Sequence, residues 1–160
     1  MGMEIEKKFL LKSDEWKSYN PVGIVMKQGY VPTSNRSSVR IRIAGETAYV
    51  TFKSPVRGIS RNEFEYEIPI EDAEAVLSSI CVKPYIEKIR YKIKYGNHLW
   101  EIDVFDGDNS GLILAEIELE HEYETFLIPD WIGEEVTGNF MYYNSNLVKY
   151  PYKEWGDTIG

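Results

Sequence analysis

Two pairs of carboxylates are the first residues in this sequence whose types and spacing could do chemistry. Glu4 and Glu6 stand two residues apart near the start of the chain, and Glu116 and Glu118 repeat that spacing. In a β-strand, residues i and i+2 point to the same face, so each pair places two carboxylates side by side. Carboxylate oxygens are ligands that Mg2+ and Mn2+ prefer. If the two strands meet across a common space, the four residues form a site for such an ion.

Six basic residues offer the complementary chemistry on other segments of the chain. Arginine can hold phosphate oxygens through two parallel hydrogen bonds, and lysine supplies a compact positive charge. Six cations exceed what one phosphate group needs, so they favour a chain of phosphates that divalent metal joins to the acidic residues. These candidate substrate-binding residues are Lys8, Arg40, Arg42, Lys53, Lys88 and Arg90.

Charged and apolar residues alternate along the stretches that contain these side chains, and the charges within one stretch mostly share a sign. Residues 4–8, 40–42, 88–94, 101–103 and 116–120 all show the pattern. Like charges on one strand face repel, and a solvated face usually mixes signs. The segregation therefore favours a channel that holds a polyvalent ligand. The alternatives are an ordinary sheet with one solvated face, or charges that only pair among themselves as salt bridges.

Length and composition limit the class of protein. The chain has 160 residues, which fits a single domain, residues 1–160, with a core of useful size. Its net charge of -8 and pI near 4.9 argue against a general binder of nucleic acid or anionic membrane, because such a protein needs a dominant basic surface. Cys81 is the only cysteine, so no intrachain disulfide is possible. With no membrane-length apolar run and no signal peptide, the chain is expected in the cytoplasm.

The elements that position these residues are predicted to be mainly antiparallel strands. The periodicity predicts them over about residues 3–11, 25–30, 40–44, 48–53, 61–68, 86–95, 99–105 and 112–122. Helical spacing predicts a helix over 71–80, and Ser13 is a predicted cap of a short helix. Such strands could form an open sheet, or a closed barrel with a polar lumen and helices outside. Because the helices cover the apolar faces only in part, a homodimer is also expected.

Seven short motifs, in order along the chain, resemble the strand motifs of the CYTH superfamily, also called the triphosphate tunnel metalloenzymes. The opening Glu4-Ile-Glu6-Lys-Lys8 matches the family signature Glu-x-Glu-x-Lys. The other six are Val39-Arg40-Ile41-Arg42, Thr51-Phe-Lys53, Arg61-Asn-Glu63-Phe-Glu65, Lys88-Ile-Arg90, Glu101-Ile-Asp103 and Ala115-Glu116-Ile-Glu118. Residues 135–147 resemble the family's C-terminal region, but Met141 and Tyr142 stand where many relatives have a basic residue. The role of that segment therefore stays open.

The resemblance implies an α+β fold, in which an eight-stranded antiparallel closed barrel forms a charged tunnel and helices pack on the outside. It also implies Mg2+ or Mn2+ held by acidic residues, a triphosphate held by basic residues, and often a homodimer. On that analogy, the metal ligands are Glu4, Glu6, Glu63, Glu65, Asp103, Glu116 and Glu118. The residues assigned to catalysis are Glu4, Glu6, Lys8, Lys88 and Asp103.

The residues and the resemblance together predict metal-dependent hydrolysis of a triphosphate, with inorganic tripolyphosphate as the first candidate. One metal is expected to bridge phosphate oxygens to Glu4 and Glu6, and a second to activate water. The family also includes class IV adenylyl cyclases and organic triphosphatases such as thiamine triphosphatase, and both remain alternatives. No sequence feature builds an adenine pocket. A different class of function is a polyphosphate- or nucleotide-binding module without turnover.

Overall fold

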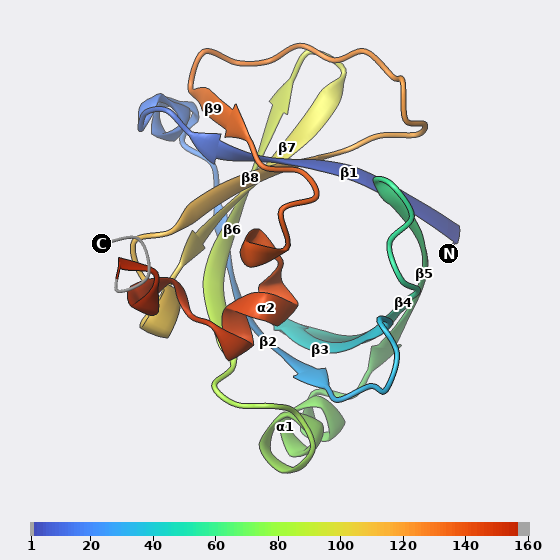
Figure 1. The fold of residues 1–160 in the computed structure, drawn as a ribbon. Coiled ribbons are helices and arrows are strands. Elements are labelled where there is room, and N and C mark those ends of the chain that lie inside the picture. Colours follow the sequence, from blue (N-terminus) through green and yellow to red (C-terminus); the bar gives the residue numbers. More distant parts are fainter. Residues whose placement is uncertain (1, 157–160) are drawn as a thin grey trace.

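Eight antiparallel strands close into a barrel in the computed structural model, which describes residues 2–156 (Figure 1). The strand order is β5-β4-β3-β2-β6-β7-β8-β1, and pairing between β1 and β5 closes the ring. The predicted fold class is therefore confirmed. The strands are β1 (Gly2–Leu11), β2 (Gly23–Val31), β3 (Ser38–Ala44), β4 (Thr47–Lys53), β5 (Ser60–Ile68), β6 (Ile86–Tyr95), β7 (His98–Phe105) and β8 (Ile113–Glu118), and β9 (Ile132–Glu135) adds to β1.

Strand β1 joins the two edges of the sheet. Its first residues pair with β5, with Glu4 opposite Arg61, and its later residues pair with β8, with Glu6 opposite Glu118. Closure leaves no free edge between these strands. It also explains why β8 ends at Glu118 and not near residue 122 as predicted, because the stretch of β1 beyond that point is already paired with β5. Strand β9 was not predicted from the sequence.

Apolar side chains on the outer face of β1, β6, β7 and β8 form one core. Trp100 is fully buried there and contacts the rings of Phe9 and Trp131 at centroid distances of 5.4 and 6.3 Å. A 3-10 helix, η1 (Glu15–Tyr19), covers this face with the buried Trp16. It begins after Asp14, so the predicted cap at Ser13 is wrong, although the Ser13 hydroxyl still accepts a hydrogen bond from the Glu15 amide at 3.3 Å.

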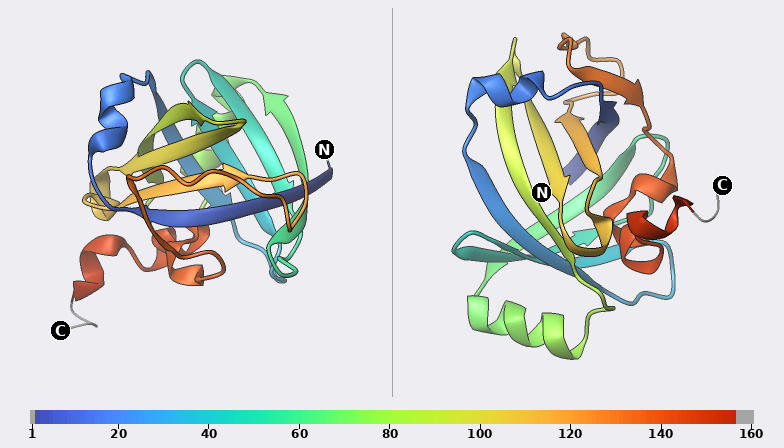
Figure 2. Two further views of the ribbon diagram at one scale, coloured as in Figure 1. Left: turned by 90° about the horizontal axis from the view of Figure 1, so that it is seen from above. Right: turned by 90° about the vertical axis from the view of Figure 1, so that its left-hand side faces the viewer.

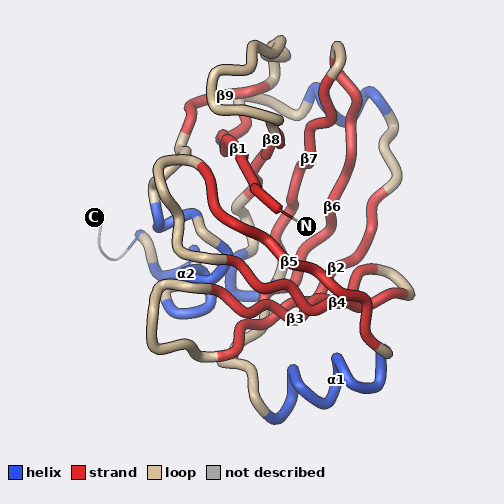
Figure 3. The backbone as a smooth tube through the Cα atoms, turned by 90° about the vertical axis from the view of Figure 1, so that its right-hand side faces the viewer, coloured by secondary structure: helices blue, strands red, loops and turns tan. Residues whose placement is uncertain are grey.

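Helix α1 (Ile70–Ser79) packs outside the wall formed by β2, β3 and β4 (Figures 2 and 3). Its buried residues Ala73 and Leu77 contact Ile41, Ala48 and Cys81. The helix predicted over 71–80 is confirmed with a shift of one residue. No helix among residues 2–156 is long and apolar enough to cross a membrane.

Helix α2 (Asn144–Lys149) lies at one end of the barrel (Figure 1). The inward face of the strands becomes apolar at that end: Ile86 lies two residues before Lys88, and Leu114 two before Glu116. These apolar residues pack against Leu147 and Val148 of α2. The charged lumen is therefore limited to part of the barrel, and α2 closes its floor. The remaining 3-10 helices are η2 (Gly107–Asn109), η3 (Phe140–Tyr142) and η4 (Tyr152–Glu154).

Candidate active site

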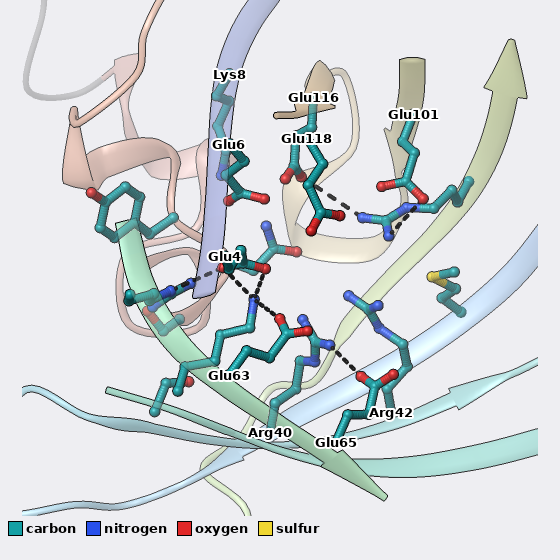
Figure 4. Close-up of a pocket in the computed structure, with 18 of the residues that line it drawn as sticks. Glu4, Glu6, Lys8, Arg40, Arg42, Glu63, Glu65, Glu101, Glu116 and Glu118 are labelled. Atoms are coloured by element: carbon teal, nitrogen blue, oxygen red, sulfur yellow. Dashed lines mark hydrogen bonds and ion pairs between the residues drawn. The ribbon is translucent and has the colours of Figure 1, made fainter. Parts of the chain in front are cut away.

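A charged cavity of about 460 Å³ occupies the barrel interior. All eight barrel strands and the segment from residue 137 to residue 145 contribute to its lining. Figure 4 shows side chains from different strands converging on this space. Of the residues singled out from the sequence, the lining includes Glu4, Glu6, Lys8, Arg40, Arg42, Lys53, Glu63, Glu65, Lys88, Arg90, Glu116 and Glu118.

We call Glu4, Glu6, Glu116 and Glu118, from β1 and β8, the acidic wall. Burial and then the charges of Glu116 and Glu4 raise the pKa of Glu6 to about 8. Burial also acts to raise the pKa of Glu116, but Lys8 and Arg90 outweigh it and lower that pKa to about 2. A hydrogen bond joins the carboxyl groups of Glu6 and Glu116. The two carboxyls therefore share one proton at neutral pH, because two adjacent buried charges of one sign repel.

Glu4 lies where β1 meets β5, between two cations. Its carboxylate accepts hydrogen bonds from Lys53 Nζ at 2.9 Å and from Arg61 Nε at 3.1 Å. Burial opposes ionisation of Glu4, but Lys53, a hydrogen bond with Glu63 and the charge of Arg61 lower its pKa to about 2. Burial and Glu4 raise the pKa of Glu63. Arg61 lines the cavity and was not among the predicted site residues, although it belongs to the same strand motif as Glu63.

We call Arg40, Arg42, Lys88 and Arg90, from β3 and β6, the basic wall. Lys88 Nζ donates to Asp103 Oδ2 at 2.7 Å, and Arg90 donates to both Asp103 oxygens at 2.8 and 2.9 Å. Asp103 is 1% exposed and is not part of the cavity lining. Arg90 and Lys88 hold the pKa of Asp103 far below its usual range in spite of burial. Asp103 therefore lies behind the basic wall as the counter-ion of Lys88 and Arg90.

The two arginines of β3 have different neighbours. Arg40 lies 3.4 Å from Glu65, whose side chain is 40% exposed and also accepts a hydrogen bond from Thr51. Arg42 Nε donates instead to the amide oxygen of Gln28 at 2.8 Å. Burial and the charges of Arg40 and Arg90 lower the pKa of Arg42 to about 9. Arg42 is thus a cation whose charge is not cancelled locally.

The C-terminal segment completes the cavity at its closed end. Lys8 Nζ donates to the backbone oxygen of Tyr142 at 3.1 Å and lies 5.5 Å from the centroid of the Tyr143 ring. The side-chain oxygen of Asn144 accepts from Lys88 Nζ at 2.9 Å. The sequence left the role of this segment open, and the contacts give it one, since it holds two cavity lysines.

The chemistry of the acidic residues fits a divalent metal ion that binds together with phosphate. Among residues 2–156, no three His, Cys, Asp or Glu side chains form a ready-made metal group. Mg2+ is commonly held by one or two carboxylates plus substrate phosphate oxygens, so an all-protein cage is not required. Glu6 and Glu116 supply such a pair, and a cation beside them would relieve the repulsion that raises the pKa of Glu6.

Comparison with known proteins points to one family. The family model of the CYTH domain matches residues 2–149. An inorganic triphosphatase of Acetivibrio thermocellus is 50% identical over 155 residues, which cover 97% of this chain and 99% of that protein. An inorganic triphosphatase of Nitrosomonas europaea is 36% identical over 148 residues, covering 90% and 95%. A crystal structure of an inorganic triphosphatase matches with a TM-score of 0.63 at 32% identity, covering 91% of this chain and 97% of that one.

Proposed function

This chain belongs to the CYTH domain family, and we propose that it hydrolyses inorganic triphosphate in its tunnel. The observation that carries the proposal is that an acidic wall and a basic wall line one cavity of about 460 Å³. The relatives that are 50% and 36% identical over nearly the whole chain are inorganic triphosphatases, which supports the same reaction here.

The acidic wall is assigned to metal binding. Glu4, Glu6, Glu116 and Glu118 offer only carboxylate oxygens, a donor set that favours Mg2+ or Mn2+. When bound, such an ion supplies charge neutralisation at phosphate oxygens and lowers the pKa of a coordinated water. Glu63 and Glu65 lie at the edge of this set, and each is beside a cation, Lys53 and Arg40 respectively.

The basic wall and Lys8 are assigned to binding and orienting the phosphate chain. Lys88 and Arg90 are held by Asp103 before substrate arrives, so little reorganisation accompanies binding. Fixed cations of this kind stabilise charge that develops on the transferred phosphoryl group and the leaving pyrophosphate. Asp103 acts through Lys88 and Arg90, so we assign it a positioning role and not direct contact with substrate.

The test is an assay of the purified protein with tripolyphosphate, ATP and thiamine triphosphate side by side, with and without Mg2+ or Mn2+. We expect metal-dependent conversion of tripolyphosphate to phosphate and pyrophosphate, with a higher kcat/KM than for the other two substrates. Cyclic AMP as the major product from ATP would overturn the proposal in favour of a cyclase. Tight binding of tripolyphosphate without turnover would instead indicate a binding module.

The outer face of β4 and β5 supports self-association. Phe52 and Phe64 are cross-strand neighbours and are 42% and 45% exposed, and Tyr66 is 51% exposed. Exposed apolar patches of this kind often mark an interface, so a homodimer through this face forms part of the proposal. In sedimentation velocity at micromolar concentration, the wild type is expected as a dimer and Phe64→Asp as a monomer. A monomeric wild type would contradict it.

A further inference from the structure

Gln28 is an uncharged residue fully buried in the charged barrel. It lies on β2 and is 0% exposed. Its side-chain oxygen accepts from Arg42 Nε at 2.8 Å. Its amide nitrogen donates to the Tyr30 hydroxyl at 3.0 Å and to the Asn144 side-chain oxygen at 3.1 Å. A buried amide with this many partners links the elements that carry them, here β2, β3 and the C-terminal segment.

Two cations fix the direction of this hydrogen-bond chain. Arg42 cannot accept a hydrogen bond, and Lys88 donates to the side-chain oxygens of Asp103 and Asn144, so each of the two faces an oxygen. Lys88 therefore requires the oxygen of Asn144, and that oxygen in turn requires the NH2 group of Gln28. The oxygen of Gln28 is then left for Arg42. A glutamate at position 28 could not donate to Asn144, because a carboxylate only accepts.

Arg42 differs from the other cations of the basic wall in its partner. Arg90 and Lys88 have Asp103, and Arg40 has Glu65. Within the part of the chain that the structure describes, Arg42 has no carboxylate within 4.0 Å. The neutral oxygen of Gln28 thus fixes the guanidinium at Nε without cancelling its charge. The terminal NH groups of Arg42 remain available to a polyanion in the cavity that this residue lines.

Lys88, at the other end of this hydrogen-bond chain, is oriented in the same way. An ammonium group has three N–H donors. One is directed to Asp103 at 2.7 Å and one to Asn144 at 2.9 Å, which fixes the direction of the third. Lys88 also lines the cavity. Gln28 and Asn144 therefore connect two cations that face one space.

We propose that Gln28 is a positioning residue that sets the affinity for the phosphate chain, directly through Arg42 and through Asn144 on Lys88. The inference rests on the proposed function. The proposal depends on the amide of Gln28 being uncharged. A negatively charged side chain of the same shape would also accept the hydrogen bond from Arg42, but its charge would weaken the binding of an anion.

The experiment compares Gln28→Ala and Gln28→Glu with the wild type in tripolyphosphate turnover. Because Gln28→Ala removes a hydrogen bond to a charged group, we expect it to raise KM about tenfold with kcat changed by less than about threefold. Gln28→Glu should raise KM further, because its carboxylate cancels the charge of Arg42. Equal KM values for the two variants, or a fall in kcat at constant KM, would overturn the proposal.

Asn109→Ala is the matched control for general loosening. Asn109 is also a buried amide and also anchors the C-terminal segment, accepting from the Tyr152 backbone at 2.8 Å, but it does not line the cavity. It should lower the melting temperature and leave KM unchanged. If it raises KM as much as Gln28→Ala does, the positioning role is wrong.

Two further measurements keep the result interpretable. Asn144→Ala removes the hydrogen bond that Lys88 donates to Asn144, at a partly exposed position. It should raise KM even if the Gln28 variants fold poorly. An unchanged KM would count against the proposal. Calorimetric titration with tripolyphosphate measures affinity without turnover. A wild type that binds but does not hydrolyse would overturn the proposed function, while weaker binding by Gln28→Ala would still support the role of Gln28.

Discussion

The acidic wall and the basic wall of the tunnel neutralise their charges in different ways. The basic wall has its own counter-ions, with Asp103 fully buried behind Lys88 and Arg90 and Glu65 beside Arg40. In the acidic wall, Glu4 pairs with Lys53 and Arg61, whereas Glu6 is buried beside the carboxyls of Glu116 and Glu4 and retains a proton. A metal ion can replace a proton, whereas a fixed ammonium or guanidinium cannot be exchanged. The basic wall is therefore pre-oriented, and the acidic wall is ready to accept a cation.

The largest effect is expected from neutralising the acidic wall. Glu6→Gln should lower kcat for tripolyphosphate by at least about 100-fold, because it removes a carboxylate assigned to the metal. Its melting temperature should not fall, since the replaced group is already protonated at neutral pH. Phosphate release and thermal unfolding measure the two quantities. Glu67→Gln, an exposed position on β5 outside the cavity, is the control and should retain wild-type rates.

Removing the counter-ion of the basic wall should act on stability. Asp103→Asn removes the carboxylate from the buried Lys88 and leaves Arg90 with only its longer contacts to Glu101 and Glu116, at 3.5 and 3.7 Å. A broken buried ion pair costs about 3–5 kcal/mol of unfolding free energy. Urea denaturation measures the loss. Glu65→Gln, at a side chain 40% exposed, is the comparison and should cost less than about 1 kcal/mol. Equal costs for the two variants would show that the basic wall does not depend on buried compensation.

Arg42→Ala should separate binding from turnover. Arg42 is held by the neutral Gln28, so its charge is directed to substrate and its removal should raise KM about 10- to 100-fold. The change in kcat should be smaller. Steady-state kinetics with tripolyphosphate decide the point, and a wild-type KM would remove Arg42 from the site.

The shared proton of the acidic wall predicts a pH dependence of stability. The pKa of Glu6 is raised from 4.5 to about 8 by folding, so the folded protein holds a proton that the unfolded chain releases. Without metal, the unfolding free energy of the wild type should therefore fall relative to Glu6→Gln as pH rises from about 4.5 to about 8. Denaturation in EDTA at several pH values measures this difference. A difference that is flat over this range would contradict the shared proton.

The smallest effect is expected at the exposed end of β6. Lys92 Nζ is 3.9 Å from Glu101, and its side chain is 48% exposed. Lys92→Ala should change stability by less than about 0.5 kcal/mol and KM by less than about threefold, because exposed ion pairs contribute little. A larger rise in KM would show that Lys92 also contacts substrate and belongs to the basic wall.

The sequence was sufficient for the eight barrel strands, apart from the end of β8, and for the side of each strand that bears charge. The strand predicted over 86–95 matches β6 residue for residue, since four basic residues alternate with apolar ones over its length. The same parity placed Glu4, Arg42 and Glu118 toward one interior. Period-two alternation depends only on backbone geometry, which is why it can be read from one chain.

The tertiary structure decided which charges meet and where the charged lumen ends. Glu4 pairs with Lys53 and Arg61, about fifty residues away, because β1 closes the ring against β5. Alternation along β7 places Asp103 on the lumen side, yet Asp103 lies behind Lys88 and Arg90. Alternation predicts the side of the sheet on which a residue lies, but not whether other side chains cover it. Gln28 is an uncharged strand residue that the charge pattern does not mark. Its importance follows only from Arg42, which it contacts, and from Lys88, which shares Asn144 with it.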